Sequence, residues 1–202
     1  MLEFLSHDNE DAVSLLKNDH QKVKELFDAF EKSDSLKEKR KIAAEAIMEL
    51  KIHASIEEEI FYRTVRKPIG KKIMNEADEE HHVAKVLIAE LETMNGKESH
   101  YDAKFKVLSE NVRHHIKEEE NDMLPKARAL PIDMNALGKK MLTRKLHLKK
   151  AGVAIFAEEK VVALSKGRGD SPAKAAQKKN ARPSVKKAKS NSSTKRRAGA
   201  RK

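Results

Sequence analysis

The sequence predicts an all-α protein, an up-down-up-down four-helix bundle with a short extra C-terminal helix and a disordered basic tail. Three observations predict this class. Apolar residues recur at i, i+3, i+4 and i+7 through the body of the chain, Gly and Pro are confined to junctions, and no alternating strand pattern appears. Four such segments joined by short loops pack as antiparallel neighbours. We expect the bundle in residues 1–130, an additional helical segment in 131–165 and the tail in 166–202.

The first two helices follow from their caps and their apolar stripes. The first should span residues 10–32, with Asn9 as its N-cap. The second should span residues 36–65, because Ser35 and Glu38 have the spacing of a capping box and a Pro-Ile-Gly sequence soon ends the pattern. The inward stripes are Leu16, His20, Val23, Phe27 and Phe30 in the first helix, and Ile42, Ala46, Leu50, His53, Glu57 and Ile60 in the second.

The third and fourth helices make the second half of the bundle. The third should stop at Asn95-Gly96, and Ser99, with Asp102 three residues later, should open the fourth. A shorter amphipathic piece, residues 133–148, is expected to pack outside the bundle, and residues 153–164 are apolar enough to dock at a place that the pattern does not indicate. The stripes are Ile73, Ala77, His81, Ala84, Ile88 and Leu91, then Tyr101, Phe105, Leu108, Val112, His115, Glu119 and Met123.

Charge divides the chain into a near-neutral body and a basic tail. The net charge is +11, yet residues 166–202 alone carry 14 Lys and Arg against one acid, Asp170. The absence of Cys excludes disulfides and thiolate metal sites. The N-terminus does not have the pattern of a secretory signal, and no run approaches the roughly 18–20 apolar residues of a spanning helix. We therefore expect a soluble cytoplasmic protein with no membrane insertion.

Four segments each place a histidine on an apolar stripe, and two of them continue to a glutamate four residues later. The segments are NDHQKV, HASIEEE, EEHHVAKV and HHIKEEE. Residues i and i+4 lie on one face of a helix, so four such faces would bring four imidazoles and two carboxylates together. Two neighbouring histidines, His82 and His114, fall on the polar flanks of their helices. The inward set is His20, His53, Glu57, His81, His115 and Glu119.

A metal site explains this set better than core packing does. A lone histidine on an apolar face is usually a hydrogen-bonded core residue, but glutamate is almost never fully buried without a partner. Imidazole and carboxylate without sulfur suit iron, manganese or zinc. Glu57 and Glu119 could bridge two ions, leaving open positions for a small ligand unless Glu58 or Glu118 also coordinates. Tyr62 and Met123 lie one or two turns beyond these residues; core packing is the favoured interpretation for both, and shaping of the pocket is the alternative.

The motifs DH, HASIEEEIFY, EEHH and HHIKEEENDMLP resemble those of the hemerythrin-like family, the HHE cation-binding domains, over residues 10–130. The resemblance implies a non-haem di-iron centre held at the six inward positions. The sequence departs from the oxygen-carrying hemerythrins at two positions and there resembles the bacterial HHE branch, whose members have varied roles. Lys85 stands where oxygen carriers have a second histidine in the third helix, and Glu119 follows His115 by four residues instead of five. Ferritin-like Glu-x-x-His spacing occurs only at Glu79–His82, off the stripe, and is disfavoured.

The tail predicts a polyanionic partner. Its composition, which includes SPAKAA, resembles linker-histone tails, and binding through it would be sequence-independent and salt-dependent. Nucleic acid, with nucleoid association, is favoured over a solubilising or membrane-surface role. No aromatic residue is interleaved for base stacking. The basic positions are Lys178, Lys179, Arg182, Lys186, Lys187, Lys189, Lys195, Arg196 and Arg197.

Three functions remain open on the sequence. The first is a di-iron protein that binds or senses O2 or NO, or handles iron and oxidative stress, and is tethered to DNA by its tail. The second is a di-iron oxidase or peroxide-consuming enzyme. The third is a DNA-compacting protein whose bundle is purely structural. The pattern does not decide whether the protein is an enzyme, and it assigns no oligomeric state.

Overall fold

The structure is a computed structural model that describes residues 10–167, and every regular element in that range is helical. This confirms the all-α class. Asn9 and residues 168–202 of the predicted tail lie outside the described residues, whereas Lys166 and Gly167, expected in the tail, end α8. The helices are α1 (Ala12–Lys32), α2 (Leu36–Ile56), α3 (Tyr62–Ile69), α4 (Lys71–Glu92), α5 (Tyr101–Glu118), α6 (Leu124–Arg128), α7 (Met134–Ala151) and α8 (Ala157–Gly167), with π-helical turns η2 (Glu57–Phe61) and η3 (Glu119–Met123).

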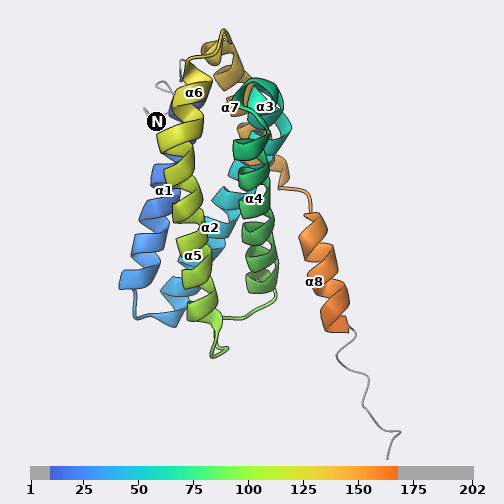
Figure 1. Cartoon of the computed structure of the whole chain (residues 1–202). Coiled ribbons are helices and arrows are strands. Elements are labelled where there is room, and N and C mark those ends of the chain that lie inside the picture. Colours follow the sequence, from blue (N-terminus) through green and yellow to red (C-terminus); the bar gives the residue numbers. More distant parts are fainter. Residues whose placement is uncertain (1–9, 168–202) are drawn as a thin grey trace, which may run out of the picture. The chain divides into compact units, whose positions relative to one another are not determined.

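Four long rods make the bundle (Figure 1). They are α1, α2 continued through η2 into α3, α4, and α5 continued through η3 into α6; α1 pairs with α2 and α4 pairs with α5. The buried apolar side chains fall into two clusters. One, around Leu16, Phe61 and Met74, lies toward α3, α6 and α7, and the other, around Phe27 and Phe105, lies toward the opposite ends of the rods. The histidine-bearing turns lie between these two clusters.

The two π-helical turns were not expected from the sequence, which predicts unbroken α-helix there. Each turn begins at a glutamate of the inward set: the Tyr62 N–H donates to the Glu57 carbonyl, and the Leu124 N–H donates to the Glu119 carbonyl. A π turn inserts one residue, so more consecutive side chains face inward than an α-helix allows. Such turns occur preferentially at functional sites.

The helix ends correct several boundaries. Asp11 caps α1, because its carboxylate accepts from the N–H groups of Val13 and Ser14 (2.9 and 3.0 Å). The prediction that Ser99 opens the fourth helix was wrong: α5 begins at Tyr101 without a side-chain cap. The expected contact of Ser35 is present, since its hydroxyl accepts from the Glu38 N–H (3.4 Å).

The rod that begins with α2 is longer than predicted. It runs through Val65 and Pro68 to Ile69, and ends where Gly70 adopts a φ of 98° and its N–H donates to the Arg66 carbonyl (3.1 Å). A positive φ is favourable only for glycine, so the stop is set by Gly70 rather than by the proline.

The C-terminal segments pack on the bundle. Helix α7, capped by Asp133, lies against α1 and α2, as expected for a piece outside the four-helix core. Gly138 permits this approach, because a Cβ atom there would lie 2.3 Å from the Glu10 carbonyl oxygen. Helix α8 lies along α4, which gives residues 153–164 their place. In the described range, no helix has the length and apolar character needed to cross a membrane.

Candidate metal centre

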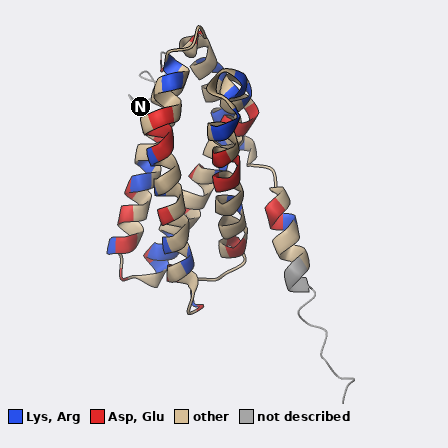
Figure 2. Ribbon diagram, viewed as in Figure 1, with Lys and Arg blue, Asp and Glu red and all other residues tan. Residues whose placement is uncertain are grey.

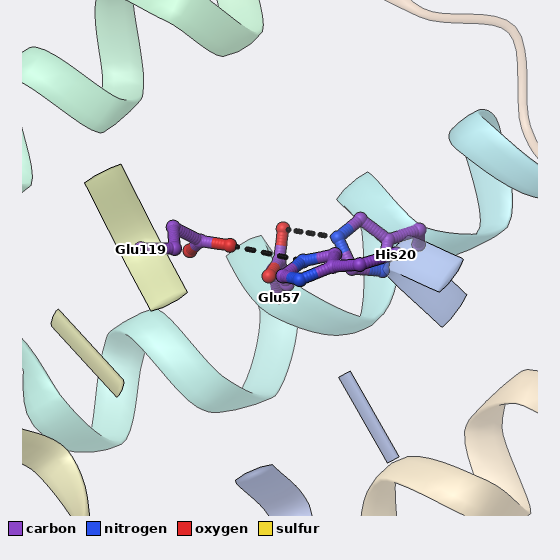
Figure 3. A group of neighbouring side chains, drawn as sticks. His20, Glu57 and Glu119 are labelled. Carbon is purple, nitrogen blue, oxygen red and sulfur yellow. Dashed lines mark ion pairs between the residues drawn. The ribbon is translucent and has the colours of Figure 1, made fainter. Parts of the chain in front are cut away.

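The structure brings the six inward residues into one buried layer across the bundle. Three come from the first two rods of the bundle and three from the last two, and each is at most 7 % exposed. Figure 3 shows side chains of this layer pointing toward one another. The layer consists of His20 (α1), His53 (α2), Glu57 (η2), His81 (α4), His115 (α5) and Glu119 (η3).

Each glutamate lies between a histidine of its own helix and a histidine of another. Glu57 Oε2 is 3.2 Å from His53 Nε2 and 3.3 Å from His81 Nε2. Glu119 Oε2 is 3.2 Å from His20 Nε2 and 3.6 Å from His115 Nε2. Donor atoms that share an ion at bond lengths of about 2.1 Å and right angles lie about 3 Å apart. The spacing is therefore that of ligands arranged around ions.

Two overlapping groups of donors result. One contains His20, His53, Glu57 and Glu119, and the other contains Glu57, His81 and His115. Glu57 belongs to both groups, so its carboxylate lies within reach of both sets of histidines. Glu119 likewise approaches a histidine of each group.

Unpartnered polar atoms show that the layer fits a cation. Despite the short separations, no hydrogen bond satisfies Nε2 of His20 and His53, both carboxylate oxygens of Glu57, or Oε2 of Glu119. A buried polar atom without a partner costs about 1–3 kcal/mol, and native proteins tolerate few of them. A pair of divalent ions would satisfy these atoms together, and the nitrogen and oxygen donor set suits iron, manganese or zinc.

A second layer of four carboxylates surrounds the imidazoles and faces their Nδ1 atoms. Three are within hydrogen-bond distance, at 3.0 Å for Glu120 to His20, 2.7 Å for Glu58 to His81 and 2.7 Å for Glu80 to His115. Asp19 faces His53 from 3.7 Å, too far for a hydrogen bond. A carboxylate that accepts from Nδ1–H fixes the ring orientation and leaves the Nε2 lone pair free for a metal.

These four outer acids follow one rule. Each is the sequence neighbour of an inner-layer residue on its own helix, but it supports a histidine of a different helix. Sequence reasoning included Glu58 among additional candidates and missed Asp19, Glu80 and Glu120. The signal was present, because the motifs DH, EEHH and HHIKEEE each place an acid beside an inward residue.

When no metal is bound, the buried carboxylates of this layer keep two of its histidines protonated. Burial lowers the pKa of His53, but Glu57 and Asp19 outweigh it and raise the pKa to about 10. Burial likewise lowers the pKa of His81, and Glu57 with Glu58 raises it to about 9. Burial raises the pKa of Glu57, yet His53 and His81 bring it well below its usual value. At neutral pH two imidazolium groups therefore balance the buried carboxylates.

Tyr62 belongs to the site and not only to the core, which corrects the expectation for this residue. Its O–H donates to Glu119 Oε1 (2.8 Å), and its oxygen lies 3.2 and 3.4 Å from Nε2 of His81 and His115. Burial and the neighbouring carboxylates raise the pKa of Tyr62 well above its ordinary value, so it keeps its proton. Met123 is core packing, as expected.

The additional candidates lie outside the inner layer. Glu58 accepts hydrogen bonds from His81 and Lys85, which makes it a supporting group. The exposed side chain of His82 points to Glu158 of α8 (2.9 Å). His114 and Glu118 are exposed and pair with each other (3.2 Å). The structure does not bring these last three residues to the inner layer.

A small cavity adjoins the histidines. Its volume is about 30 Å³, room for one or two water-sized molecules. Apolar side chains make up most of its wall beside the four imidazoles. The arrangement offers a dry space next to the donor atoms, where a small ligand could reach a bound metal. The apolar lining is Val23, Leu50, Ala54, Ala84, Ile88, Val112, Ile116 and Phe156.

Comparison with known proteins agrees with this geometry. The family model described as the hemerythrin HHE cation binding domain matches residues 11–127. A solved structure, a hemerythrin HHE cation binding domain-containing protein from Mycobacterium kansasii, is similar with a TM-score of 0.59 and 23 % identity, over 80 % of this chain and 94 % of that one. At this identity the likeness concerns the fold. Among curated proteins no match was found.

Proposed function

Because the chain belongs to the hemerythrin HHE cation-binding family, we propose that it holds two iron ions within the bundle and uses them to bind or sense a small ligand such as O2 or NO. The observation that carries this proposal is the set of unpartnered donor atoms on His20, His53, Glu57 and Glu119, all buried at one level of the bundle. A role in iron or oxidative-stress handling uses the same site. Manganese and zinc are the alternative metals.

The side chains of the site have different roles in this proposal. We assign the four inner histidines as terminal ligands, with Glu57 and Glu119 as bridges. When bound, the ions supply open coordination positions and electron exchange with the small ligand. The outer acids orient the imidazoles, and Tyr62 holds a proton at its hydroxyl beside His81 and His115.

Metal content tests the proposal. We expect about two irons per chain, with visible absorption, in protein expressed with iron and purified without chelators. His53→Ala and His115→Ala should lower the content, whereas His82→Ala should not, because His82 is exposed and lies outside the layer. Substoichiometric metal that none of these substitutions changes would reduce the layer to a packed core.

An oxidase or peroxide-consuming activity is a second candidate. The observation in its favour is the protonated Tyr62 hydroxyl, which lies within 3.4 Å of two of the inner histidines and could supply a proton to a reduced ligand. Catalytic consumption of hydrogen peroxide or oxygen by iron-loaded protein, reduced in Tyr62→Phe with unchanged iron content, would select it. Stoichiometric ligand binding without turnover would select the binding or sensing role.

We also propose that the basic tail associates with nucleic acid. The sequence carries this proposal, because residues 168–202 of the tail lie outside the described residues. The bundle adds positive charge where α3 meets α4 (Figure 2), and of its basic residues there only Arg66 pairs with an acid, Asp78, in the described range. These residues are Arg63, Arg66, Lys67, Lys71 and Lys72.

A truncation before Lys166 tests the tail. The full chain should bind duplex DNA with an affinity that falls steeply as salt rises, and the truncated chain should bind far more weakly. Equal affinities would contradict tethering by the tail. The double variant His53→Ala, His115→Ala separates a tethered metal protein from a DNA-compacting one, because compaction by a purely structural bundle would survive the loss of metal.

A further inference from the structure

One residue from outside the four ligand-bearing rods lines the cavity beside the histidines. Its described lining comes from α1, α2, α4 and α5, with the single exception of Phe156, which immediately precedes α8. The Phe156 ring is half-buried, and the ammonium groups of Lys85 and Lys51 lie 4.9 and 5.5 Å from its centroid. Cations at this range are attracted to an aromatic face. Phe156 is thus held at the edge of the cavity by two lysines of the bundle.

The segment that carries Phe156 is attached at a few points. The Phe156 N–H donates to Glu159 Oε1 (3.1 Å), which caps α8. Helix α8 is tied to the bundle by Glu158 with His82 (2.9 Å) and by Glu159 with Lys51 (2.8 Å). The His82–Glu158 pair is partly exposed, and such pairs contribute little to stability, whereas the Lys51–Glu159 pair is largely buried.

The apolar side chains of this segment are mostly exposed. Val162 of α8 is buried, whereas Ile155, Val161 and Leu164 are each at least 65 % exposed, and Gly152, with a φ of 85°, breaks the chain away from α7. A segment with few buried contacts opens more readily than the core it covers.

A chain of contacts joins this segment to the inner layer. Lys85, beneath the Phe156 ring, donates to Glu58, and Glu58 also accepts from His81. Phe156 is therefore linked through Lys85 to Glu58, the carboxylate that supports His81.

We infer that Phe156 is the gate of the ligand cavity and that α8 is the hinged arm that carries it. With Phe156 in place the cavity admits only molecules of one or two water volumes; when α8 releases, the opening between α2 and α4 admits larger ligands. The inference rests on the proposed function for the identity of the ligand, but the gate itself can be tested on metal-free protein.

The absence of cysteine from the chain gives a direct test. Ala84 lines the cavity, so Ala84→Cys in the full metal-free chain carries a single thiol behind the gate. We would measure its modification by methyl methanethiosulfonate, with far-UV circular dichroism as the check of folding. Adding Phe156→Ala should speed the reaction at least tenfold. Adding Glu158→Gln with Glu159→Gln, which loosens α8 without shortening Phe156, should speed it at least threefold.

Two matched controls separate gating from general loosening. Adding Val161→Ala, on the exposed face of α8, should leave the rate of Ala84→Cys unchanged. A thiol at Ala46→Cys, fully buried in the core of α2 away from the cavity, should not respond to Phe156→Ala. Rates at Ala84→Cys that stay within twofold in both gate variants would overturn the inference, as would equal acceleration at Ala46→Cys.

Iron-loaded protein distinguishes this inference from the proposed function. Azide, followed by its visible absorption, should associate faster with Phe156→Ala than with the unsubstituted chain at equal iron content. Thiol labelling that responds to the gate in a protein that binds neither iron nor azide would retain the gate and reject the proposed function. Iron binding with unresponsive labelling would do the reverse.

Discussion

Metal binding should expel about two protons per chain at neutral pH. The perturbation is titration of the metal-free protein with Zn²⁺, which has the same donor preferences as ferrous iron without its redox chemistry. The pKa of His53 is about 10 and that of His81 about 9, so both imidazoles are protonated at pH 7.5. A histidine must be neutral to coordinate, so each must lose its proton when the ion arrives.

The pH dependence follows from the same values. Two protons released per chain mean that the overall affinity rises about 100-fold for each unit of pH between 7 and 8.5. The slope should flatten as the pH passes about 9 and then about 10, where His81 and His53 are already neutral.

Isothermal titration in buffers of different ionisation enthalpy measures the proton count, and competition with a chelator measures the affinity. The exposed residue His82 provides a control, because His82→Ala should release as many protons as the unsubstituted protein. Release of less than half a proton per chain, with an affinity independent of pH from 7 to 8.5, would refute the reasoning, since it would mean that the metal-free layer does not hold its charge on these imidazoles.

Three further predictions follow from named contacts. The free energy of unfolding of metal-free protein, measured in urea, should fall as the pH rises through about 9 to 10. Protonated His53 and His81 stabilise the fold fully below about pH 6.5, and this stabilisation is lost above their folded pKa values. Equal stability at pH 7 and 10.5 would contradict this. Glu58→Gln should weaken metal affinity by about 10- to 100-fold, and the exposed control Glu118→Gln should not; equal affinities would show that Glu58 does not orient His81. Gly138→Ala should destabilise the fold by about 1–3 kcal/mol, because the added Cβ would lie 2.3 Å from the Glu10 carbonyl oxygen. This cost should outweigh the preference of helices for alanine over glycine, about 1 kcal/mol, and a variant that is more stable in urea would disprove the close approach.

Periodicity was sufficient to predict the rods and the facing of the inner residues. A histidine and a glutamate spaced i, i+4 on one stripe need no knowledge of the rest of the fold, and the fact that the structure gathers His53 and Glu57 with His115 and Glu119 agrees with that argument. Their role as ligands stays a prediction. The gathering itself required only that four inward faces meet.

The features that escaped prediction depend on contacts between helices or on single-residue irregularities. A π turn adds one residue to the helix, which a stripe of 3.6 periodicity does not register, so the hydrogen bond from Tyr62 to Glu119 was not foreseen. The outer acids Asp19, Glu80 and Glu120 act on rings of other helices, and the register between helices is not written in the period of either one.

The outer acids connect the four rods in one consecutive order around the bundle. An acid of α1 faces a ring on α2 at 3.7 Å, and the other three contacts are hydrogen bonds: the turn after α2 supports a ring on α4, α4 supports a ring on α5, and the turn after α5 closes the circle on α1. A substitution of an outer acid on one rod should therefore alter the imidazole resonance of the histidine on the next rod in this order. The histidine on its own rod should not respond. Neither half of the chain can complete the circle alone, so orientation of the four rings should arise in one cooperative step, when the last rod docks.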